Sequence, residues 1–204
     1  MRNNNNKNQN ILAGLVLDEP VLKLQTTKEN FYKFRLGVKR LSEVEDIVTV
    51  TIPEKLLDKE IIKLGNYIEV IGPLRSHNKT EENMRRLFIE IFPYEMRLLG
   101  IESYTNRISL EGTICKKPVP RKNSRGMDLC DVFIAVNNDN RSDYIPCVLW
   151  GKDVKDVVLD LDVGSVISIN GRLQSRTYSK RADGNVLYTR TILEVSANKI
   201  EILN

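Results

Sequence analysis

The chain is poor in the residue types on which catalysis and metal binding depend. Its 204 residues include one histidine, His77, so a Ser–His–Asp catalytic triad could use only this one imidazole. No GxxxxGK[ST] or GxGxxG phosphate-binding loop occurs. The three cysteines, Cys115, Cys130 and Cys147, are widely spaced without a CxxC pair, which is typical of small core residues in a reducing cytosol. The sequence therefore predicts a protein that is not an enzyme and takes no cofactor, metal ion or small-molecule substrate.

Signals for membrane insertion and export are also missing. No stretch of about 18 apolar residues, the length that crosses a bilayer, is present. The N-terminal residues Met1–Asn8 are polar and lack the apolar core of a signal peptide, so we expect a short frayed arm. With 41% hydrophobic and 28% charged residues, the composition is ordinary for a globular protein. We expect a cytoplasmic protein that does not bind a membrane.

What the sequence does contain is an internal repeat with an offset of about 98 residues. Its clearest mark is Gly14, which aligns with Gly112 inside two similar segments. The aligned segments are Asn8–Val16 with Asn106–Ile114, Asp46–Ile52 with Asp143–Leu149, and Leu64–Leu74 with Val163–Leu173. Two copies of one fold are therefore expected, over residues 1–102 and 103–204.

Each copy is predicted to consist of strands with one helical insertion. In the second copy we expect strands over residues 107–116, 128–137, 143–150, 165–178, 186–195 and 199–203. The basic, proline-containing segment Lys117–Gly126 is expected to end the first of these strands. Asp153–Leu161 has apolar residues at helical spacing, and Ala182–Asn185 predicts a hairpin turn. Five strands with a helix between the third and fourth is the layout of the OB-fold, a Greek-key barrel. The predicted fold is all-β, with two tandem OB-folds that each carry this helix.

The strand Asp143–Lys152 is the most informative stretch. Alternation places Ile145, Cys147 and Leu149 on a core face. The opposite face carries Tyr144, Pro146, Val148 and Trp150. This second face is either buried as well or forms a platform on which flat ligands such as nucleic-acid bases stack. The first copy favours the platform, because its equivalent face has only Ile47, Thr49, Thr51 and Pro53 while its core face is retained.

Rings and cations gather on the same outer surface of the second copy. The long strand places Arg172, Gln174, Arg176 and Tyr178 there, and neighbouring strands add Phe133, Tyr188 and Arg190. Two basic segments flank it, one with Lys116, Lys117, Arg121 and Lys122, the other with Lys180 and Arg181. Stacking rings and phosphate-neutralising cations are the two requirements for binding single-stranded nucleic acid. These rings could instead cover the barrel or lie in a subunit interface.

Four motifs then occur in order over about Asn106–Leu203: NRISLEGTI, DYIPCVLWGK, GSVISINGRLQSRTY, and DGNVLYT followed by ANKIEIL. In this order and spacing they resemble the bacterial single-stranded DNA-binding proteins, OB-fold proteins of replication, recombination and repair. In that family, aromatic residues at the positions of Tyr144, Trp150 and Tyr178 stack on DNA. The resemblance implies sequence-independent binding of single-stranded DNA in the nucleoid.

The chain departs from the family pattern in three respects. A further stacking aromatic of the family falls near Asn140, so that contact is expected to be missing. The acidic C-terminal tail of the family, which recruits repair enzymes, has no counterpart before Asn204. Family members usually carry one OB-fold per chain and form homotetramers, so two copies imply a homodimer that presents four folds. Replisome proteins are the protein partners that the resemblance suggests.

The first copy is expected chiefly to build the assembly. Lys79 replaces Tyr178 there, and only Phe31, Lys33 and Arg35 could form a smaller outer patch. Arg75, Arg85 and Arg86 retain some positive charge. A second function stays open, a primosome-type or protein-interaction scaffold whose aromatic face meets a partner protein.

Overall fold

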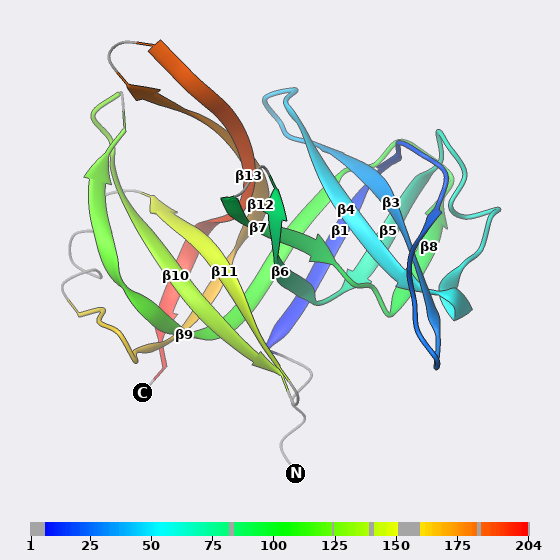
Figure 1. The fold of residues 1–204 in the computed structure, drawn as a ribbon, viewed down its shortest axis with the longest axis horizontal. Coiled ribbons are helices and arrows are strands. Elements are labelled where there is room, and N and C mark those ends of the chain that lie inside the picture. Colours follow the sequence, from blue (N-terminus) through cyan, green and yellow to red (C-terminus); the bar gives the residue numbers. More distant parts are fainter. Residues whose placement is uncertain are drawn as a thin grey trace.

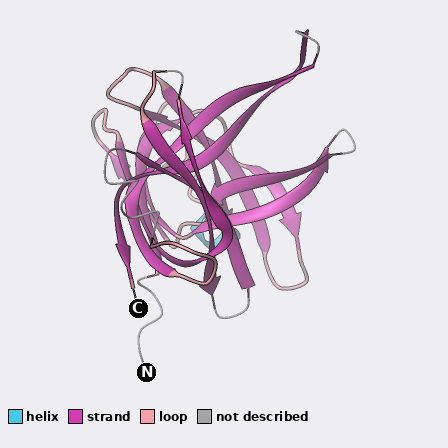
Figure 2. Cartoon of the chain, turned by 90° about the vertical axis from the view of Figure 1, so that its left-hand side faces the viewer, coloured by secondary structure: helices cyan, strands magenta, loops and turns pink. Residues whose placement is uncertain are grey.

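The structure is a computed structural model that describes residues 7–81, 84–123, 125–138, 141–150, 160–182 and 185–203. For residues 84, 180–182 and 185–188 it describes the backbone alone. Strands dominate the described part of the chain (Figure 2). The first half contains β1 (Asn8–Val16), β2 (Val21–Gln25), β3 (Asn30–Lys39), β4 (Glu45–Pro53), the 3-10 helix η2 (Glu54–Leu56), β5 (Tyr67–Gly72), β6 (Leu74–Glu81), β7 (Met84–Ile91) and β8 (Glu95–Leu99). The second half contains β9 (Thr105–Lys122), β10 (Asp128–Asn138), β11 (Arg141–Trp150), β12 (Val166–Ala182) and β13 (Asn185–Ile202).

Five strands close the second half into a barrel. β10 pairs with β9 and β11, and β12 pairs with β9 and β13, all in antiparallel fashion. The ring closes where β11 pairs in parallel with β13 over Cys147–Leu149. Alternate residues of these strands point inward, and the inward set is apolar. The barrel therefore has one buried face and one outer face.

The first half repeats this arrangement with two interruptions. β1 pairs with β3, β3 with β4, and β4 in parallel with β7. The counterpart of β12 is divided into β5 and β6 at Pro73, and the counterpart of β13 into β7 and β8 around Pro93. Proline lacks the N–H that a strand ladder needs. Both halves have a glycine at the equivalent position, because a Cβ on Gly72 would overlap the carbonyl oxygen of Phe92 and a Cβ on Gly171 that of Ser196.

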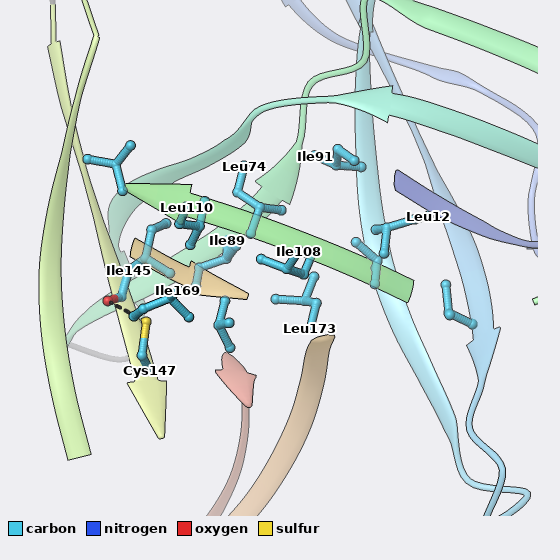
Figure 3. Close-up of a cluster of buried hydrophobic side chains, with 14 of the residues drawn as sticks. Leu12, Leu74, Ile89, Ile91, Ile108, Leu110, Ile145, Cys147, Ile169 and Leu173 are labelled. Atoms are coloured by element: carbon cyan, nitrogen blue, oxygen red, sulfur yellow. Dashed lines mark hydrogen bonds between the residues drawn. The ribbon is translucent and has the colours of Figure 1, made fainter. Parts of the chain in front are cut away.

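The two halves share one sheet and one core. β1 pairs antiparallel with β9 from Asn8↔Leu110 to Ala13↔Thr105, which joins thirteen strands of the described chain into a continuous sheet (Figure 1). Buried apolar residues of both halves form a single cluster, with Leu12 and Ile91 from the first and Ile108 from the second (Figure 3). The expected border at residues 102 and 103 falls between β8 and β9. The division into two domains stays a prediction.

Two expectations about the strands are wrong. The prolines of Lys117–Gly126 do not end the first strand, since β9 continues to Lys122. They are tolerated because β12 pairs with β9 only as far as Thr113, which leaves one edge free, and because the β9–β10 register shifts near Pro118. The predicted strands 186–195 and 199–203 are one strand, β13, with an irregularity near Lys199.

The predicted helix between the third and fourth strands is not seen. In the first half, the helical element described between β4 and β5 is η2, a single 3-10 turn. In the second half, residues 151–159 of the expected helix lie outside the described residues, as do Met1–Asn6, Asn140 and residues 183–184 of the hairpin turn. Ile62 and Leu161 are nevertheless buried at equivalent positions and join the core cluster. In the first half, a turn therefore supplies the apolar plug that a helix was expected to supply.

Candidate nucleic-acid interface

A row of three side chains crosses the outer face of the second barrel. Lys116 of β9 lies over the ring of Phe133 of β10, with its Nζ 4.7 Å from the ring centroid. The ring of Phe133 stacks beside that of Tyr144 of β11, with centroids 6.2 Å apart and planes 19° apart. The strand register places these side chains together. Phe133 lies directly opposite Lys116 in the β9–β10 pair, and Tyr144 lies opposite Ala135 in the β10–β11 pair, diagonal to Phe133. We call Lys116, Phe133 and Tyr144 the stacking row.

Two more predicted rings are exposed. Tyr144, Trp150 and Tyr178 have relative exposures of 43%, 41% and 36%, which is high for side chains that the core could have used. The expected platform on β11 is nevertheless interrupted, because Val148 is completely buried. Val148 lies between Asp131 of β10 and Ser196 of β13, with a strand on each side. Tyr144 and Trp150 are therefore two separate exposed rings at the two ends of the strand.

The long β12–β13 hairpin carries the second group of predicted residues (Figure 1). The guanidinium of Arg176 lies 5.9 Å from the ring centroid of Tyr178, and its Nε donates to Glu194 at 2.8 Å. Arg190 stands directly opposite Tyr178 in the strand register, and Arg172 is exposed. Gln174 does not line the outer surface as expected, since it is buried and donates to Glu194.

The basic segment of β9 presents its cations unevenly. Lys117 and Lys122 are exposed. Arg121 makes two hydrogen bonds to Asp131, from Nε at 2.6 Å and from Nη2 at 2.9 Å. Its charge is therefore shared with a carboxylate, whereas Lys116 points its ammonium at a ring. Lys180, Arg181 and Tyr188 are placed in β12 and β13, but their side chains lie outside the described residues.

One cation near the stacking row was missed by the sequence analysis. Arg141, three residues before Tyr144, is half exposed, and its Nη2 donates to the carbonyl of Ser76 at 2.6 Å and to Asp143 at 2.8 Å. The predicted strand starts at Asp143, whereas β11 begins at Arg141. The only available signal was its position just before the DYIPCVLWGK motif.

The equivalent surface of the first half is chemically different. At the positions of Lys116, Phe133 and Tyr144 it has Asp18, Arg35 and Ile47. Arg35 is paired with Asp18 at 2.6 Å, and Ile47 is exposed. Of the other expected outer residues, Lys33 is exposed and Phe31 is half-buried, while Thr51 is buried under an ion pair of Lys23 with Glu90. Lys79 pairs with Glu81 at 2.8 Å.

Within the described ranges, no cluster of three or more His, Cys, Asp or Glu residues could hold a metal ion. No helix among the described residues is long and apolar enough to cross a membrane.

Comparison with known proteins places these features in a family. Residues 105–203 match the model of the single-strand binding protein family. The chain is 34% identical over 106 residues to the single-stranded DNA-binding protein 1 of Clostridium acetobutylicum, covering 48% of this chain and 93% of that protein. The chain belongs to the single-strand binding protein family. It is also 32% identical over 106 residues to the Bacillus cereus single-stranded DNA-binding protein, of which it spans 62%.

A solved structure extends the likeness to both halves. The wild-type single-stranded DNA-binding protein from Thermus aquaticus superposes with a TM-score of 0.75, covering 97% of this chain and 93% of that chain at 17% identity. At that identity the likeness concerns the fold alone. The predicted all-β tandem OB-fold is confirmed, apart from the helix between strands 3 and 4.

Proposed function

We propose that this chain binds single-stranded DNA without sequence preference, in replication, recombination or repair, and that the second half supplies most of the affinity. The observation that carries the proposal is the stacking row, in which a cation and two stacked rings lie on the outer face of a barrel whose core does not need them. Membership of the family, and relatives named for binding single-stranded DNA, support the same reading.

Bases and phosphates would be bound by different groups of this surface. Tyr144, Trp150 and Tyr178 present ring faces on which bases of any sequence can stack, at about 1–3 kcal/mol per base. Lys116, Lys117 and Lys122 on β9, together with Arg172, Arg176 and Arg190 on the hairpin, would neutralise phosphates. Phe133 would support Tyr144 from beneath the bound strand. Lys180, Arg181 and Tyr188 belong to the same proposed surface.

Ion pairs within the protein determine which cations are most available to bind phosphates. Arg121 and Arg176 already face Asp131 and Glu194, so a phosphate would have to share them with a carboxylate. Lys116 and Lys117 are both exposed, and Lys116 lies over a ring, so we rank these two lysines ahead of the two arginines as phosphate contacts. Each counterion released from the DNA lowers the affinity at higher salt, with a slope of about −0.7 per phosphate contact for single strands.

The decisive experiment is a titration with oligo-dT, followed by the fluorescence of Trp150, the only tryptophan of the chain. We expect quenching on binding and an affinity that falls from low to high salt. The proposal would be contradicted if oligo-dT at low salt changed neither the fluorescence emission of Trp150 nor the electrophoretic mobility of the protein. Retention of a replisome protein from nuclease-treated lysate, without oligo-dT affinity, would instead support the scaffold alternative, which the family comparison does not favour.

The remaining features of the proposal concern the assembly and its place in the cell. We propose a protein without catalytic activity, made of two OB-fold domains per chain, that acts on DNA in the cytoplasm and the nucleoid. One OB-fold already covers 93% of the Clostridium acetobutylicum relative, so two folds per chain would allow a homodimer to present four. The exposed apolar side chains of Tyr94, Leu98 and Ile101, around β8, suit a subunit contact. Light scattering on the purified chain would test this, with twice the chain mass of 23.4 kDa expected.

A further inference from the structure

A buried carboxylate of the first half holds the binding hairpin of the second half. Asp46, at the start of β4, is completely buried. Its Oδ1 accepts hydrogen bonds from the backbone N–H of Ser175 at 2.6 Å and from the Ser175 hydroxyl at 2.7 Å. Ser175 belongs to β12, so these bonds connect residues that lie 129 positions apart.

Arg40 completes the connection. Its Nε donates to Oδ2 of Asp46 at 2.6 Å, and its Nη2 donates to the carbonyl of Ser175 at 2.8 Å. Both backbone polar groups of Ser175 are therefore bound by side chains of the first half. We call Arg40, Asp46 and Ser175 the hairpin latch. Charge-assisted bonds in a buried site fix position well, because leaving any member unpaired is costly.

The latch lies next to proposed DNA contacts. Ser175 directly precedes Arg176 and is three residues before Tyr178 on the same strand. Beyond the latch, the described part of the hairpin is held mainly by its own ladder, from Arg176↔Ile192 to Ala182↔Asn185 (Figure 1). The latch thus fixes the end of the hairpin from which the strand runs to Tyr178, and so its orientation.

The same device occurs a second time with the halves exchanged. Asp143, the repeat equivalent of Asp46, accepts from the backbone N–H of Ser76, the equivalent of Ser175, at 2.8 Å. Arg75 and Arg141 donate to the same carboxylate. The Ser76 hydroxyl in turn accepts from the N–H of Tyr144 at 2.7 Å. A carboxylate of each half therefore binds the hairpin of the other half, β12–β13 or β6–β7. One of these contacts lies near Tyr178 and the other beside Tyr144.

We propose that the first half positions the DNA-binding rings of the second half, with Asp46 and Arg40 as positioning residues for the hairpin that carries Arg176 and Tyr178. This inference rests on the proposed function and deepens it. The first half then contributes to affinity without touching the DNA through Asp46, because a pre-aimed hairpin loses less conformational freedom on binding.

The test compares Asp46→Asn with a variant matched in stability. In Asp46→Asn, whichever way the amide is turned, its NH2 group would face donors of Arg40 or of Ser175, which breaks part of the latch at constant shape. The control is Ile62→Val or Ile62→Ala, buried in the core of the first half, whichever lowers the Tm by the same amount. We expect Asp46→Asn to weaken oligo-dT binding by about 5- to 30-fold, measured well below the Tm. We expect the control to stay within about twofold of wild type, and Ser175→Ala, which keeps the N–H, to lose less than Asp46→Asn.

Equal affinities for Asp46→Asn and its stability-matched control would overturn the inference. If Asp46→Asn fails to fold, Arg40→Ala decides, because it removes the bonds to Asp46 and to the Ser175 carbonyl, and unchanged affinity in that variant would then refute the latch. Hydrogen exchange at the Ser175 amide separates this inference from the proposed function. Faster exchange in Asp46→Asn is expected even if the wild-type chain binds no oligo-dT, whereas unchanged exchange would contradict the latch whatever the DNA result.

Discussion

The two halves build the same barrel from equivalent strands and place opposite chemistry on its outer face. Across three neighbouring strands of that surface, Lys116, Phe133 and Tyr144 of the second half correspond to Asp18, Arg35 and Ile47 of the first. In one half a cation rests on a ring, with its Nζ 4.7 Å from the Phe133 centroid. In the other, the cation of Arg35 is cancelled by Asp18 at 2.6 Å. At these positions the second half presents a cation and two rings, and the first half presents an ion pair and an aliphatic side chain.

The cores, in contrast, are apolar at equivalent positions. Leu36 and Ile134 are both buried at equivalent positions of β3 and β10, and Val48 and Ile145 at equivalent positions of β4 and β11. An inward side chain must fill a closed space of fixed size, whereas an outward side chain meets only solvent or ligand. The repeat therefore preserved the barrel while its outer face diverged.

The largest effect is expected from removing rings in the second half. Tyr144→Ala with Tyr178→Ala should weaken oligo-dT binding about 100-fold or more, because each stacked base is worth about 1–3 kcal/mol. Trp150 stays in place as the fluorescent reporter. The matched change at the equivalent positions of the first half, Ile47→Ala with Lys79→Ala, should cost less than about threefold, since surface changes without a bound ligand are nearly neutral. Similar losses in the two variants would show that both halves bind.

A transplant should give the first half part of what it lacks. Asp18→Lys, Arg35→Phe and Ile47→Tyr together recreate the stacking row on the first barrel. We expect oligo-dT affinity to rise by about 3- to 30-fold, the worth of roughly one stacked base with its phosphate contact. Ile47→Tyr alone serves as the control for added apolar area. No gain from the triple variant, with the fold intact by circular dichroism, would show that the row alone does not make a site.

Acid should weaken the hold of the first half on the second. Burial would raise the pKa of Asp46, but hydrogen bonds from Arg40 and from the Ser175 N–H and hydroxyl hold it below its ordinary value. A depressed pKa in the folded state stabilises the protein above the unfolded pKa of about 3.9, and this contribution is lost as the pH falls through the folded value. The Tm of the wild type should therefore drop more steeply below about pH 4 than that of Asp46→Asn. Parallel Tm profiles would contradict this role.

The smallest effect concerns the cysteines, which all belong to the second half. Burial raises the pKa of the Cys130 thiol to about 11, and burial also raises the pKa of Cys147. Both thiols should resist labelling by DTNB in the native protein, because the thiolate is the reactive form. Since both halves share one core cluster, Ile62→Ala in the first half should speed the labelling of Cys147. Unchanged labelling would indicate that the halves open independently.

Much of the fold followed from patterns that are local along the chain. Alternation located β10 to within a residue, because an apolar-in, polar-out strand repeats every two residues. Prolines misled the prediction for β9, because a local rule does not tell that only one side of Pro118–Pro120 is paired. Val148 and Gln174 were placed on the exposed face for a similar reason. Alternation assigns a side of the sheet, but burial there depends on strands that are distant in the sequence.

The candidate site divides in the same way. Tyr144, Trp150 and Tyr178 were predicted from residue type and alternation, and all three are exposed. The hairpin latch was not predicted, although the repeat had aligned Asp46 with Asp143 at the head of equivalent strands. A polar residue at a strand end is ordinary in a sequence. Its burial and its partners become visible only once the β12–β13 hairpin lies against β4.

The class of fold, its duplication and the side of each strand that could carry rings all follow from the sequence, because they depend on side-chain period and residue type. Which of those side chains lie together depends on how the strands and the two halves pack. The stacking row needs three strands in one register, and the latch needs two barrels packed against each other. Contacts of this kind join residues up to 135 positions apart, and a pattern that repeats every two residues carries no information over such a distance.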